Sequence, residues 1–546
     1  MILLIFIALI WLGGTIYRIY QQARYFQIEE YMNGRYCRWL LAERTRWLPR
    51  RPTAAFLAGS VMTVVLTEAP GNFLAGVIGI LIALIVIWPA PQGEIKKAFR
   101  ATPRAKRLLG TGFVVAVLAA IPILLALTQL VEIGSFGFAL TALAGFVLYL
   151  LAPLFLVIAN LLMRPVEAFF RRQFVNRARH VLADIQPTII GITGSYGKTS
   201  TKTYLAHILN GRFRAYPTPK SYNTLMGVCL AINNDLTDNH SISHFIAEMG
   251  AYVPGEIQEI CDLTHPQIAI VTEVGPQHLE RFVTLDNIAI AKYEIIKALP
   301  ADGTGVFNWD NPYVRSMYER GYPATRIAIS REVDPASVPP GGPRFVASQI
   351  EEALDGTIFT VTDTTNGQTE TFNTPLLGLH NVTNILLATA VAVHEGMSLR
   401  DVSWRVRDLQ PAEARLVRQT SPEGITIIND AYSANPAGVV QSLRILGMHT
   451  TGKRLLITPG MVELGPLMNS ENRKLGEIAA QHATDVILVG RKQAEPIQQG
   501  LLAAGFPPEK LQVVDTLAES VAWYQTNLTS GDTVLFLNDL PDTYTS

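Results

Sequence analysis

The stretch IIGITGSYGKTSTKTYL, from Ile189 to Leu205, has the residue types and spacing of a phosphate-binding loop. A short apolar run, predicted to be a strand, ends at a glycine turn, and a predicted helix follows it. In this arrangement backbone N–H groups and the helix N-terminus bind phosphate oxygens. Lys198 can reach the outer phosphates, and Thr199 can ligate Mg²⁺. The predicted nucleotide-binding residues of this loop are Gly194, Ser195, Gly197, Lys198, Thr199 and Ser200.

The loop departs from the usual pattern G-x-x-x-x-G-K-[ST], because Gly191 precedes Gly197 by six positions and not by five. The ordinary interpretation is a chance glycine turn after a strand. The GKTS residues and the elements on either side argue against it. A nucleotide-binding loop alone still leaves kinases, ATPases and ligases open.

Three later segments place further reactive side chains beside predicted elements. HFIAEMGA is a predicted strand that ends at Glu248, where a carboxylate can hold a metal ion. IAIVTEVGPQHLERF is a strand followed by a loop that carries His278, and LDNIAIAKYEIIKAL is a helix that carries Lys292. Taken singly, these residues suit ordinary roles: a capping carboxylate, a loop histidine and a solvated lysine.

Taken in order, the segments from Pro187 to the C-terminus resemble the Mur ligase family. The matching segments are TGSYGKTSTK, SYNTLMGV, EMGA, GPQHLERF, AKYEII, NWDNP, GLHNVTNILLATA, ARL, NDAYSANP and TPGMVELG. Within the family, AKYEII, DAYSANP and GMVELG are most similar to the branch that adds D-alanyl-D-alanine to the peptidoglycan precursor. Ten segments in one order make the resemblance specific.

The resemblance implies roles for the matched residues. Lys198 and Thr199 would hold the β- and γ-phosphates of ATP and a first Mg²⁺, and Glu248 would complete that metal site. His278 and Lys292 would serve a second Mg²⁺, with Lys292 carbamylated, because an ammonium group cannot ligate a metal. Lys198, His278 and Lys292 are thus the expected catalytic residues.

The resemblance also implies a set of nucleotide and substrate contacts. The expected adenosine pocket comprises Asn308, Asp310, His380, Asn381 and Asn384. From the last domain, Arg415 and Asp430 would reach the nucleotide when that domain closes. The expected substrate residues are Asn223, Thr224, Tyr432 and Asn435.

The implied chemistry is ATP-dependent amide formation. A carboxylate attacks the γ-phosphate of ATP to give an acyl phosphate, and an amine then displaces phosphate. Lys198 and two Mg²⁺ ions would neutralise the developing charge. The expected acid is a muropeptide precursor, soluble or lipid-linked, and the expected amine is an amino acid or D-alanyl-D-alanine.

Three departures bear on the acid substrate. The family's N-terminal domain, which binds the uridine nucleotide of the precursor, has no counterpart here, and an apolar region stands in its place. Glu273 occupies a position where the family commonly has Asn. The C-terminal FLNDLPDTY replaces an expected basic segment. The catalytic residues therefore look intact, while recognition of the acid looks rebuilt.

The N-terminal third reads as a membrane region with about five spans. Its apolar runs are Ile2–Tyr17, Ala54–Thr67, Phe73–Ala90, Phe113–Val131 and Phe138–Met163. Several of them reach the roughly 20 residues that cross a bilayer. The spans contain almost no ionisable residues, which favours an anchor or a lipid-contacting platform over a transporter.

Arginine placement predicts the orientation. Positive charge gathers in 18–51, 94–107 and 164–179, whereas the loops TEAPGN and VEIGSFG carry no Lys or Arg. Positive loops stay in the cytoplasm, so the catalytic domains should lie there, attached to the cell membrane. Residues 164–186 mix aromatic side chains with arginines, which suits either an amphipathic helix on the inner leaflet or an ordinary connecting helix.

The predicted fold class is an α-helical membrane region followed by α/β domains. We expect a membrane region at 1–163, a linker at 164–186, a P-loop ATP-binding domain at 187–375 and a doubly wound, Rossmann-like C-terminal domain at 376–546. A hairpin turn is expected at Asn366-Gly367.

The composition excludes some partners, and two other functions stay open. The soluble part shows no basic stripe, so a nucleic-acid partner is not expected. Membrane lipid is an expected partner. Cys37, Cys229 and Cys261 show no metal-binding or disulfide spacing. Two other functions stay open: a membrane-bound ligase that makes a poly-γ-glutamate-like chain, and a P-loop ATPase that drives transport.

Overall fold

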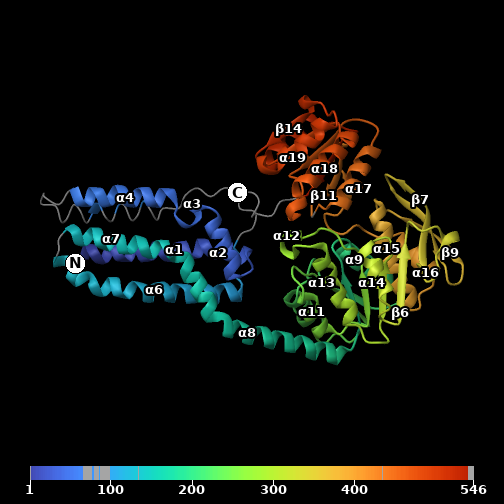
Figure 1. The fold of residues 1–546 in the computed structure, drawn as a ribbon, viewed down its shortest axis with the longest axis horizontal. Helices are drawn as coiled ribbons and strands as arrows, with labels where there is room; N and C mark the ends of the chain where they lie inside the picture. The colour runs from blue at the N-terminus through green and yellow to red at the C-terminus, as the bar shows by residue number, and fades with distance from the viewer. Residues whose placement is uncertain are drawn as a thin grey trace. The chain divides into compact units, whose positions relative to one another are not determined.

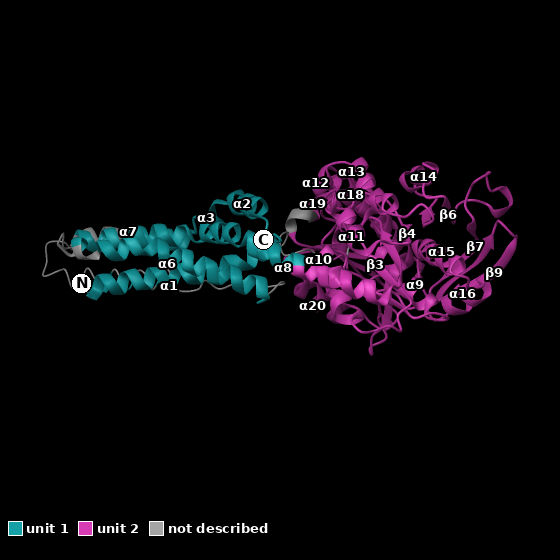
Figure 2. Ribbon diagram, turned by 90° about the horizontal axis from the view of Figure 1, so that it is seen from below, with its two compact units in different colours: residues 1–172 teal, residues 173–546 magenta. Residues whose placement is uncertain are grey.

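The computed structural model describes residues 2–65, 77–78, 81, 85, 99–132, 135–432 and 434–538. The chain divides into two compact units, Met1–Arg172 and Gln173–Ser546, coloured separately in Figure 2. In the described residues the first unit is helical, and the strands all belong to the second. The last eight residues, which hold most of the FLNDLPDTY segment, lie outside the described part.

The first unit is a bundle of apolar helices. Its helices are α1 (Ile2–Ile28), α2 (Asn33–Ala42), α3 (Arg44–Trp47), α4 (Arg50–Val65), α6 (Pro103–Glu132), α7 (Ser135–Leu150) and the first part of α8 (Ala152–Ile185). Trp11 of α1 packs edge-on against Phe146 and Tyr149 of α7, with ring centroids 5.9 and 6.1 Å apart. These contacts give the helices a shared core of their own.

Three helices are long and apolar enough to cross a membrane by length and composition: Ile2–Ile28, Pro103–Ala126 and Ala152–Ile185. The predicted run Ala54–Thr67 falls on α4, which has 16 described residues and is shorter than a span. The run Phe73–Ala90 lies almost entirely outside the described residues. The described helices therefore provide three full-length candidates where the sequence predicts five.

The predicted fifth span, Phe138–Met163, covers parts of two helices, α7 and α8, with a one-residue turn at Leu151 between them. Pro153 has no N–H group to donate to the carbonyl of Tyr149 four residues earlier, so one continuous helix would lose a hydrogen bond here. The Tyr149 carbonyl oxygen instead accepts a hydrogen bond from Arg18 Nη1 at 3.1 Å. A side chain from α1 thus satisfies the group that the proline leaves open.

Helix α8 continues to Ile185 without a break, so it passes through the predicted boundary at 163/164. Its last residues belong to the second unit, where Ala178 and Leu182 are buried in a hydrophobic core. The carbonyl oxygen of Phe174 accepts a hydrogen bond from Asn233 Nδ2 at 3.0 Å. Residues 173–185 therefore pack through this apolar face on the core of the second unit.

The second unit begins with a nine-stranded sheet in the order β2-β3-β1-β4-β5-β6-β7-β8-β9. The strands from β2 to β7 pair in parallel, and β7, β8 and β9 pair antiparallel. The strands are β1 (Thr188–Thr193), β2 (Ala215–Pro217), β3 (His244–Glu248), β4 (Ile268–Val271), β5 (Thr304–Asn308), β6 (Thr325–Ser330), β7 (Phe345–Ala353), β8 (Gly356–Asp363) and β9 (Gln368–Thr374). The predicted turn at Asn366-Gly367 joins β8 to β9, so it is confirmed.

Helices cover both faces of this sheet. They are α9 (Lys198–Leu209), α10 (Leu225–Ala231), α11 (Glu256–Thr264), α12 (Leu279–Phe282), α13 (Leu285–Lys297), α14 (Pro312–Glu319), α15 (Leu379–His394) and α16 (Leu399–Val406). Ile190 of β1 packs in the core with α9 and α15, whereas its neighbour Ile189 packs in the core with α11 and α13. Successive residues of a strand face opposite sides, so the sheet is buried on both faces.

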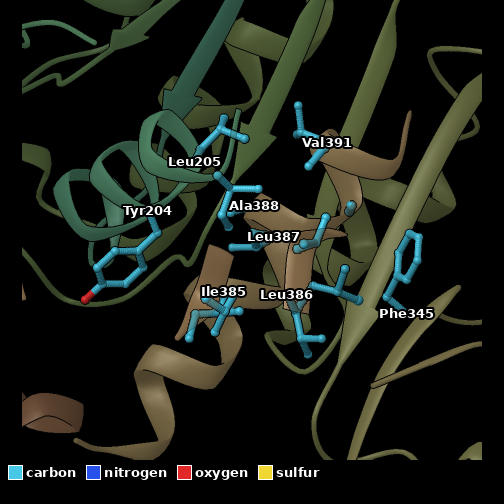
Figure 3. Close-up of a cluster of buried hydrophobic side chains, with 14 of the residues drawn as sticks. Tyr204, Leu205, Phe345, Ile385, Leu386, Leu387, Ala388 and Val391 are labelled. Carbon is cyan, nitrogen blue, oxygen red and sulfur yellow. The ribbon is translucent and has the colours of Figure 1, made fainter. Parts of the chain in front are cut away.

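Residues 376–409, which the sequence analysis assigns to the C-terminal domain, lie in the core of the central sheet. Figure 3 shows Leu386 and Leu387 of α15 in one buried cluster with Leu205 of α9 and Phe345 of β7. The division between the cores therefore falls after α16. The sequence pattern near Leu376 does not show that α15 and α16 pack against the sheet that precedes them in the chain.

A second sheet of six strands follows, in the order β10-β11-β15-β12-β13-β14, with β10 antiparallel to the rest. Its strands are β10 (Val417–Thr420), β11 (Thr426–Asp430), β12 (Arg454–Thr458), β13 (Asp485–Val489), β14 (Leu511–Val514) and β15 (Thr533–Leu537). Its helices are α17 (Pro436–Met448), α18 (Met468–His482), α19 (Arg491–Ala503) and α20 (Leu517–Asn527). The predicted fold class is confirmed (Figure 1).

Candidate active site

The phosphate loop joins the end of β1 to the start of α9, at the carboxyl edge of the parallel strands. Gly197 has φ of 80°, and a Cβ atom there would lie 2.5 Å from Asn384 Oδ1. A Cβ atom on Gly194 would lie 1.8 Å from Thr272 Oγ1. Both positions therefore require glycine, and the loop can turn tightly enough to present its N–H groups.

Lys198 is the first residue of α9 and folds back over the loop. Its Nζ donates hydrogen bonds to the carbonyl oxygens of Gly194 at 2.7 Å and Ser195 at 3.4 Å. Burial lowers the pKa of Lys198 to about 8, Glu248 opposes this shift, and Arg415 adds to it. The ammonium group is thus held at the loop with little compensating charge, which suits it to bind phosphate.

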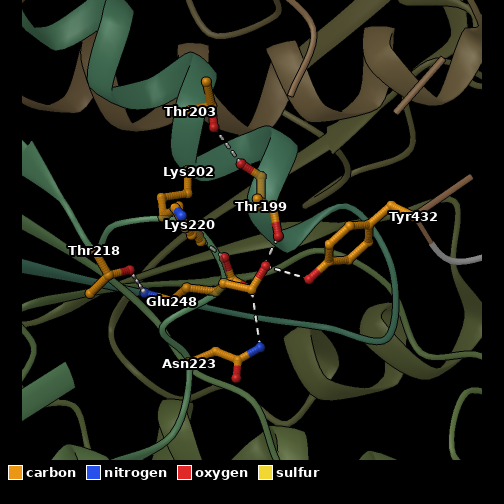
Figure 4. Close-up of polar contacts among 9 residues, drawn as sticks. Thr199, Lys202, Thr203, Thr218, Lys220, Asn223, Glu248 and Tyr432 are labelled. Atoms are coloured by element: carbon orange, nitrogen blue, oxygen red, sulfur yellow. Dashed lines mark hydrogen bonds and ion pairs between the residues drawn. The ribbon is translucent and has the colours of Figure 1, made fainter. Parts of the chain in front are cut away.

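Glu248, at the end of β3, is the most heavily bonded carboxylate of the site (Figure 4). Oε1 accepts hydrogen bonds from Thr199 Oγ1 and Asn223 Nδ2, both at 3.2 Å. Oε2 forms an ion pair with Lys202 Nζ at 2.9 Å. Burial raises the pKa of Glu248, but Lys202 and Lys198 lower it more, so the net shift is downward. The residue is therefore ionised at neutral pH.

The loop from Thr218 to Thr224 wraps around this carboxylate. Thr218 Oγ1 accepts a hydrogen bond from the Glu248 N–H at 3.1 Å, and the Lys220 carbonyl accepts one from Lys202. Thr224, a predicted substrate residue, caps α10 by accepting a hydrogen bond from Gly227 N at 3.3 Å. The structure gives Thr224 a local structural role and gives Asn223 a place at Glu248.

His278 lies in the loop after β4 and contacts the C-terminal domain. Its Nδ1 is hydrogen-bonded to Glu463 Oε2, and its ring lies edge-on to Tyr252 with centroids 4.7 Å apart. Burial lowers the pKa of His278, while Glu463 raises it and Lys198 and Arg281 lower it. Charged groups from both domains therefore surround one imidazole.

Lys292 is buried on α13, with 4% of its surface exposed. In the part of the chain that the structure describes, no hydrogen bond or ion pair engages its side chain. Burial and the charge of Lys198 lower the pKa of Lys292 well below its ordinary value. Burial therefore disfavours the charged form of its amine, unlike that of a solvated surface lysine.

The predicted adenosine residues divide into two groups. Asn381 and Asn384 hold α15 against α9, since they accept hydrogen bonds from Tyr204 at 2.9 Å and Thr201 at 3.2 Å. His380 differs, because its Nδ1 is buried and has no hydrogen-bond partner among the residues that the structure describes. Burial lowers the pKa of His380 to about 4, and Arg331 and Arg415 add to this shift.

Asp310 and Asn308 form a turn after β5. Asp310 accepts hydrogen bonds from the Ser330 hydroxyl and from the Arg331 N–H, the latter at 2.9 Å. Asn308 Oδ1 accepts one from the Asp310 N–H at 3.1 Å. Asn308 therefore bonds within the turn, whereas Asp310 ties the turn to the end of β6.

Two residues of the C-terminal domain face the phosphate loop. The guanidinium of Arg415 lies 4.6 Å from the ring centroid of Tyr432, and the Tyr432 hydroxyl bonds with Ser221. Asp430 stays behind them: its carboxylate accepts hydrogen bonds from Ser442 at 2.5 Å and from Leu416 N at 3.2 Å. Its bond to Leu416 N holds the backbone next to Arg415, and burial raises the pKa of Asp430.

Asn435 is the remaining predicted substrate residue. Its Oδ1 accepts a hydrogen bond from Gly438 N at 2.9 Å and caps α17. The Asn-Pro pair before an apolar helix is a sequence signal for such a cap.

Three residues of the site were missed by sequence reasoning. Lys202 follows Lys198 by one helical turn, so its position was readable, but its burial against Glu248 was not. Glu463 lies in the quoted segment TPGMVELG, and Arg331 follows β6. Their contacts with His278 and Asp310 join segments far apart in sequence, which spacing does not reveal.

Fold and site together define a P-loop nucleotide-binding enzyme built from two α/β domains. The model of the Mur ligase middle domain matches residues 192–392, and that of the Mur ligase glutamate ligase domain matches 414–538. The chain therefore belongs to the Mur ligase family, as the sequence predicts. Like the family, it is an ATP-dependent ligase that forms amide bonds.

Relatives of known activity match the same region. The UDP-N-acetylmuramoyl-tripeptide--D-alanyl-D-alanine ligase of Bacillus subtilis is 28% identical over 360 residues, covering 66% of this chain and 74% of that protein. The enzyme of the same name from Escherichia coli is 29% identical over 327 residues, covering 60% and 70%.

Solved structures share the fold. MurF ligase from Thermotoga maritima in complex with ADP superimposes with a TM-score of 0.59 at 24% identity, covering 69% of this chain and 81% of that one. MurF from Acinetobacter baumannii gives 0.58 at 24% identity, covering 68% and 78%.

Proposed function

We propose that this ligase joins the amine of D-alanyl-D-alanine, or of an amino acid, to a carboxyl group of a peptidoglycan precursor. The observation that carries the proposal is the arrangement of Lys198, Thr199 and Glu248 at one strand edge, in a chain similar to ligases of that name. The acid would become an acyl phosphate, and the amine would displace phosphate from it.

The residues present fit a Mg²⁺ ion beside the loop. The Thr199 hydroxyl and Glu248 Oε1 lie 3.2 Å apart, and both are the oxygen ligands that Mg²⁺ prefers. Lys202 and Asn223 fix the carboxylate, so Oε1 keeps facing Thr199. Mg²⁺ held there would neutralise charge on the phosphates. Lys198 would add a second positive charge at the outer phosphate.

A second metal position would involve His278 and a carbamylated Lys292. Carbamylation needs an uncharged amine: the nitrogen attacks CO₂, a C–N bond forms, and a proton leaves. Burial and the charge of Lys198 lower the pKa of Lys292, which favours the uncharged amine that this step needs. The carbamate would be an anion, and the nearby cation of Lys198 would stabilise it.

The membrane region suggests where the acid is held. Three helices have the length and composition of membrane spans, and arginine-rich segments flank them. We propose that the catalytic unit lies in the cytoplasm and that the acid is presented at the inner leaflet. Guanidinium groups bind pyrophosphate in a bidentate way, so a lipid-linked precursor suits these segments.

The full-length protein in lipid nanodiscs allows a direct test. Phosphate release is measured with ATP, D-alanyl-D-alanine or other amines, and either a soluble uridine-linked or a lipid-linked muropeptide. Products are identified by mass spectrometry, and Lys198→Ala serves as the inactive control. We expect phosphate release only when acid and amine are both present, with the lipid-linked acid preferred.

The other outcomes are informative. Phosphate release without acid or amine would favour a transport ATPase over a ligase. Glutamate chains as the product would favour the poly-γ-glutamate-like alternative. Equal rates with both muropeptides would refute the lipid-linked acid and leave the ligase intact.

A further inference from the structure

Glu463 of the C-terminal domain reaches into the central domain and contacts two of its side chains. Its Oε2 is hydrogen-bonded to His278 Nδ1, and its Oε1 lies 3.7 Å from Arg281 Nη2. The Arg281 guanidinium in turn lies 4.0 Å from the ring centroid of Tyr252. Side chains that follow β3, β4 and β12 therefore form one cluster at the carboxyl edges of both sheets.

This cluster fixes the His278 ring on two sides. Tyr252 packs edge-on against the ring, and Glu463 engages Nδ1. Both His278 and Glu463 have left-handed backbones, with φ of 56° and 62°. A positive φ is uncommon in residues other than glycine, although histidine adopts it more often than most, and it persists where surrounding contacts enforce it. The remaining ring nitrogen, Nε2, is thus held in one orientation.

A metal-ligating histidine almost always donates its other ring N–H to a carboxylate or carbonyl, which fixes the tautomer and aims the ligating nitrogen. Glu463 occupies that place for His278. We propose that Glu463 is a positioning residue that aims His278 Nε2 at the second metal. This inference rests on the proposed role of His278 as a metal ligand.

The origin of Glu463 gives this contact a further consequence. Its carboxylate is carried by the segment after β12, in the C-terminal domain, whereas His278 belongs to the central domain. The histidine is oriented only when the two domains are docked. Binding of the second metal and docking of the C-terminal domain therefore favour each other, as linkage requires.

Metal binding can be measured apart from turnover. The full-length protein is titrated with Mn²⁺ in the presence of ADP, and free Mn²⁺ is followed by electron paramagnetic resonance. We compare Glu463→Ala, Glu463→Gln and His278→Ala with the unmodified protein. Glu477→Ala is the matched control, since Glu477 is a half-exposed glutamate on α18 of the same domain.

We expect Glu463→Ala to weaken one class of Mn²⁺ sites by about 10- to 100-fold, the range for loss of such a supporting group. Glu463→Gln keeps an oxygen acceptor for Nδ1–H and should recover most of the affinity. Recovery by Gln distinguishes positioning from a general effect of the substitution on packing. The Mg²⁺ concentration for half-maximal ligation should rise in the same order, and Glu477→Ala should match the unmodified protein.

Two results would overturn parts of the scheme separately. If His278→Ala binds Mn²⁺ normally, His278 is not a ligand and the proposed second metal site fails. If His278→Ala weakens binding but Glu463→Ala leaves it within twofold, the metal site stands and the role of Glu463 fails. Circular dichroism and thermal melting identify any variant that does not fold, and Glu463→Gln then decides the outcome.

Discussion

At the scale of single residues, the chemistry of this enzyme depends on ionisable groups that are buried in the protein. The pKa values of Lys198, Glu248 and Lys292 are all lowered. Burial is the main cause for the two lysines, whereas for Glu248 the charges of Lys202 and Lys198 outweigh burial. Shifted ionisable groups gather at functional sites because catalysis needs unusual protonation states. Here burial disfavours the charged form of both lysines, and neighbouring cations keep the carboxylate ionised.

The buried position of Lys292 leads to a testable prediction. Lys292→Ala should lose nearly all ligation, and short carboxylic acids should restore part of it, because they can occupy the position of the carbamate. Steady-state phosphate release with and without acetate or propionate measures this. Lys297→Ala, on the last turn of the same helix, is the control and should keep its activity. An alanine variant with most of its activity would exclude the ligand role.

The ion pair between Lys202 and Glu248 predicts an effect on stability. Lys202→Met leaves a buried carboxylate without its nearest cation and should cost about 3–5 kcal/mol in the free energy of unfolding at pH 7. Adding Glu248→Gln to it should restore part of the loss, since the uncompensated charge is gone. Denaturant unfolding of the single and double variants measures both. Equal stability of Lys202→Met and the unmodified protein would contradict a buried, ionised pair.

The same ion pair makes the free energy of unfolding depend on pH. The pKa of Glu248 lies below its ordinary value of 4.5 in the folded protein. Its contribution to stability is therefore fully present above about pH 4.5 and is lost as the pH falls through the lowered value. Between pH 7 and 5 the contribution should stay constant, which unfolding curves at several pH values can verify.

At the scale of elements, the end of helix α8 decides how the two units are joined. Its sequence mixes aromatic side chains and arginines, and that pattern suits a membrane surface as well as a protein core. The tertiary structure selects the core for residues 173–185, because Ala178 and Leu182 are buried there. A side chain can lie against the bilayer only if nothing else covers it.

Packing of α8 predicts that Leu182→Ala destabilises the catalytic unit by about 2–5 kcal/mol, the usual cost of truncating a buried leucine. Arg177→Ala, on the exposed face of the same helix, is the control and should change stability by less than about 0.5 kcal/mol. Denaturant unfolding followed by tryptophan fluorescence in detergent measures the difference. Similar stabilities for both variants would indicate that this face is not packed.

At the scale of the whole molecule, charge is divided between the two parts of a neutral chain. Residues 1–180 hold nineteen Lys or Arg, seven Glu and no Asp, so the remainder is acidic. The positive segments alternate along the chain with loops that carry no Lys or Arg, and positive loops stay in the cytoplasm. This pattern predicts that ATP is bound on the cytoplasmic side of the membrane.

Cys37 is a natural reporter of that orientation. It lies in the arginine-rich segment 18–51 and is partly exposed, whereas Cys229 and Cys261 are buried. A membrane-impermeant maleimide should label it in inside-out vesicles and not in intact spheroplasts. Cys37→Ser is the control for labelling of the other two. Labelling in intact spheroplasts would contradict the predicted orientation, because Cys37 would then lie outside the cytoplasm.

The sequence by itself determined the local features: the phosphate loop, the strands that end at Glu248 and before His278, the helix with Lys292, and the order of both α/β domains. These follow from short-range periodicity, turn residues and motif spacing, which neighbouring residues fix. Only the tertiary structure decided that Lys202 pairs with Glu248, that Glu463 reaches His278 and that α15 and α16 pack on the central sheet. It also divided the fifth apolar run at Pro153, where Arg18 bonds the open carbonyl. Each of these contacts joins residues distant in sequence or depends on burial, and neither property is encoded in local spacing.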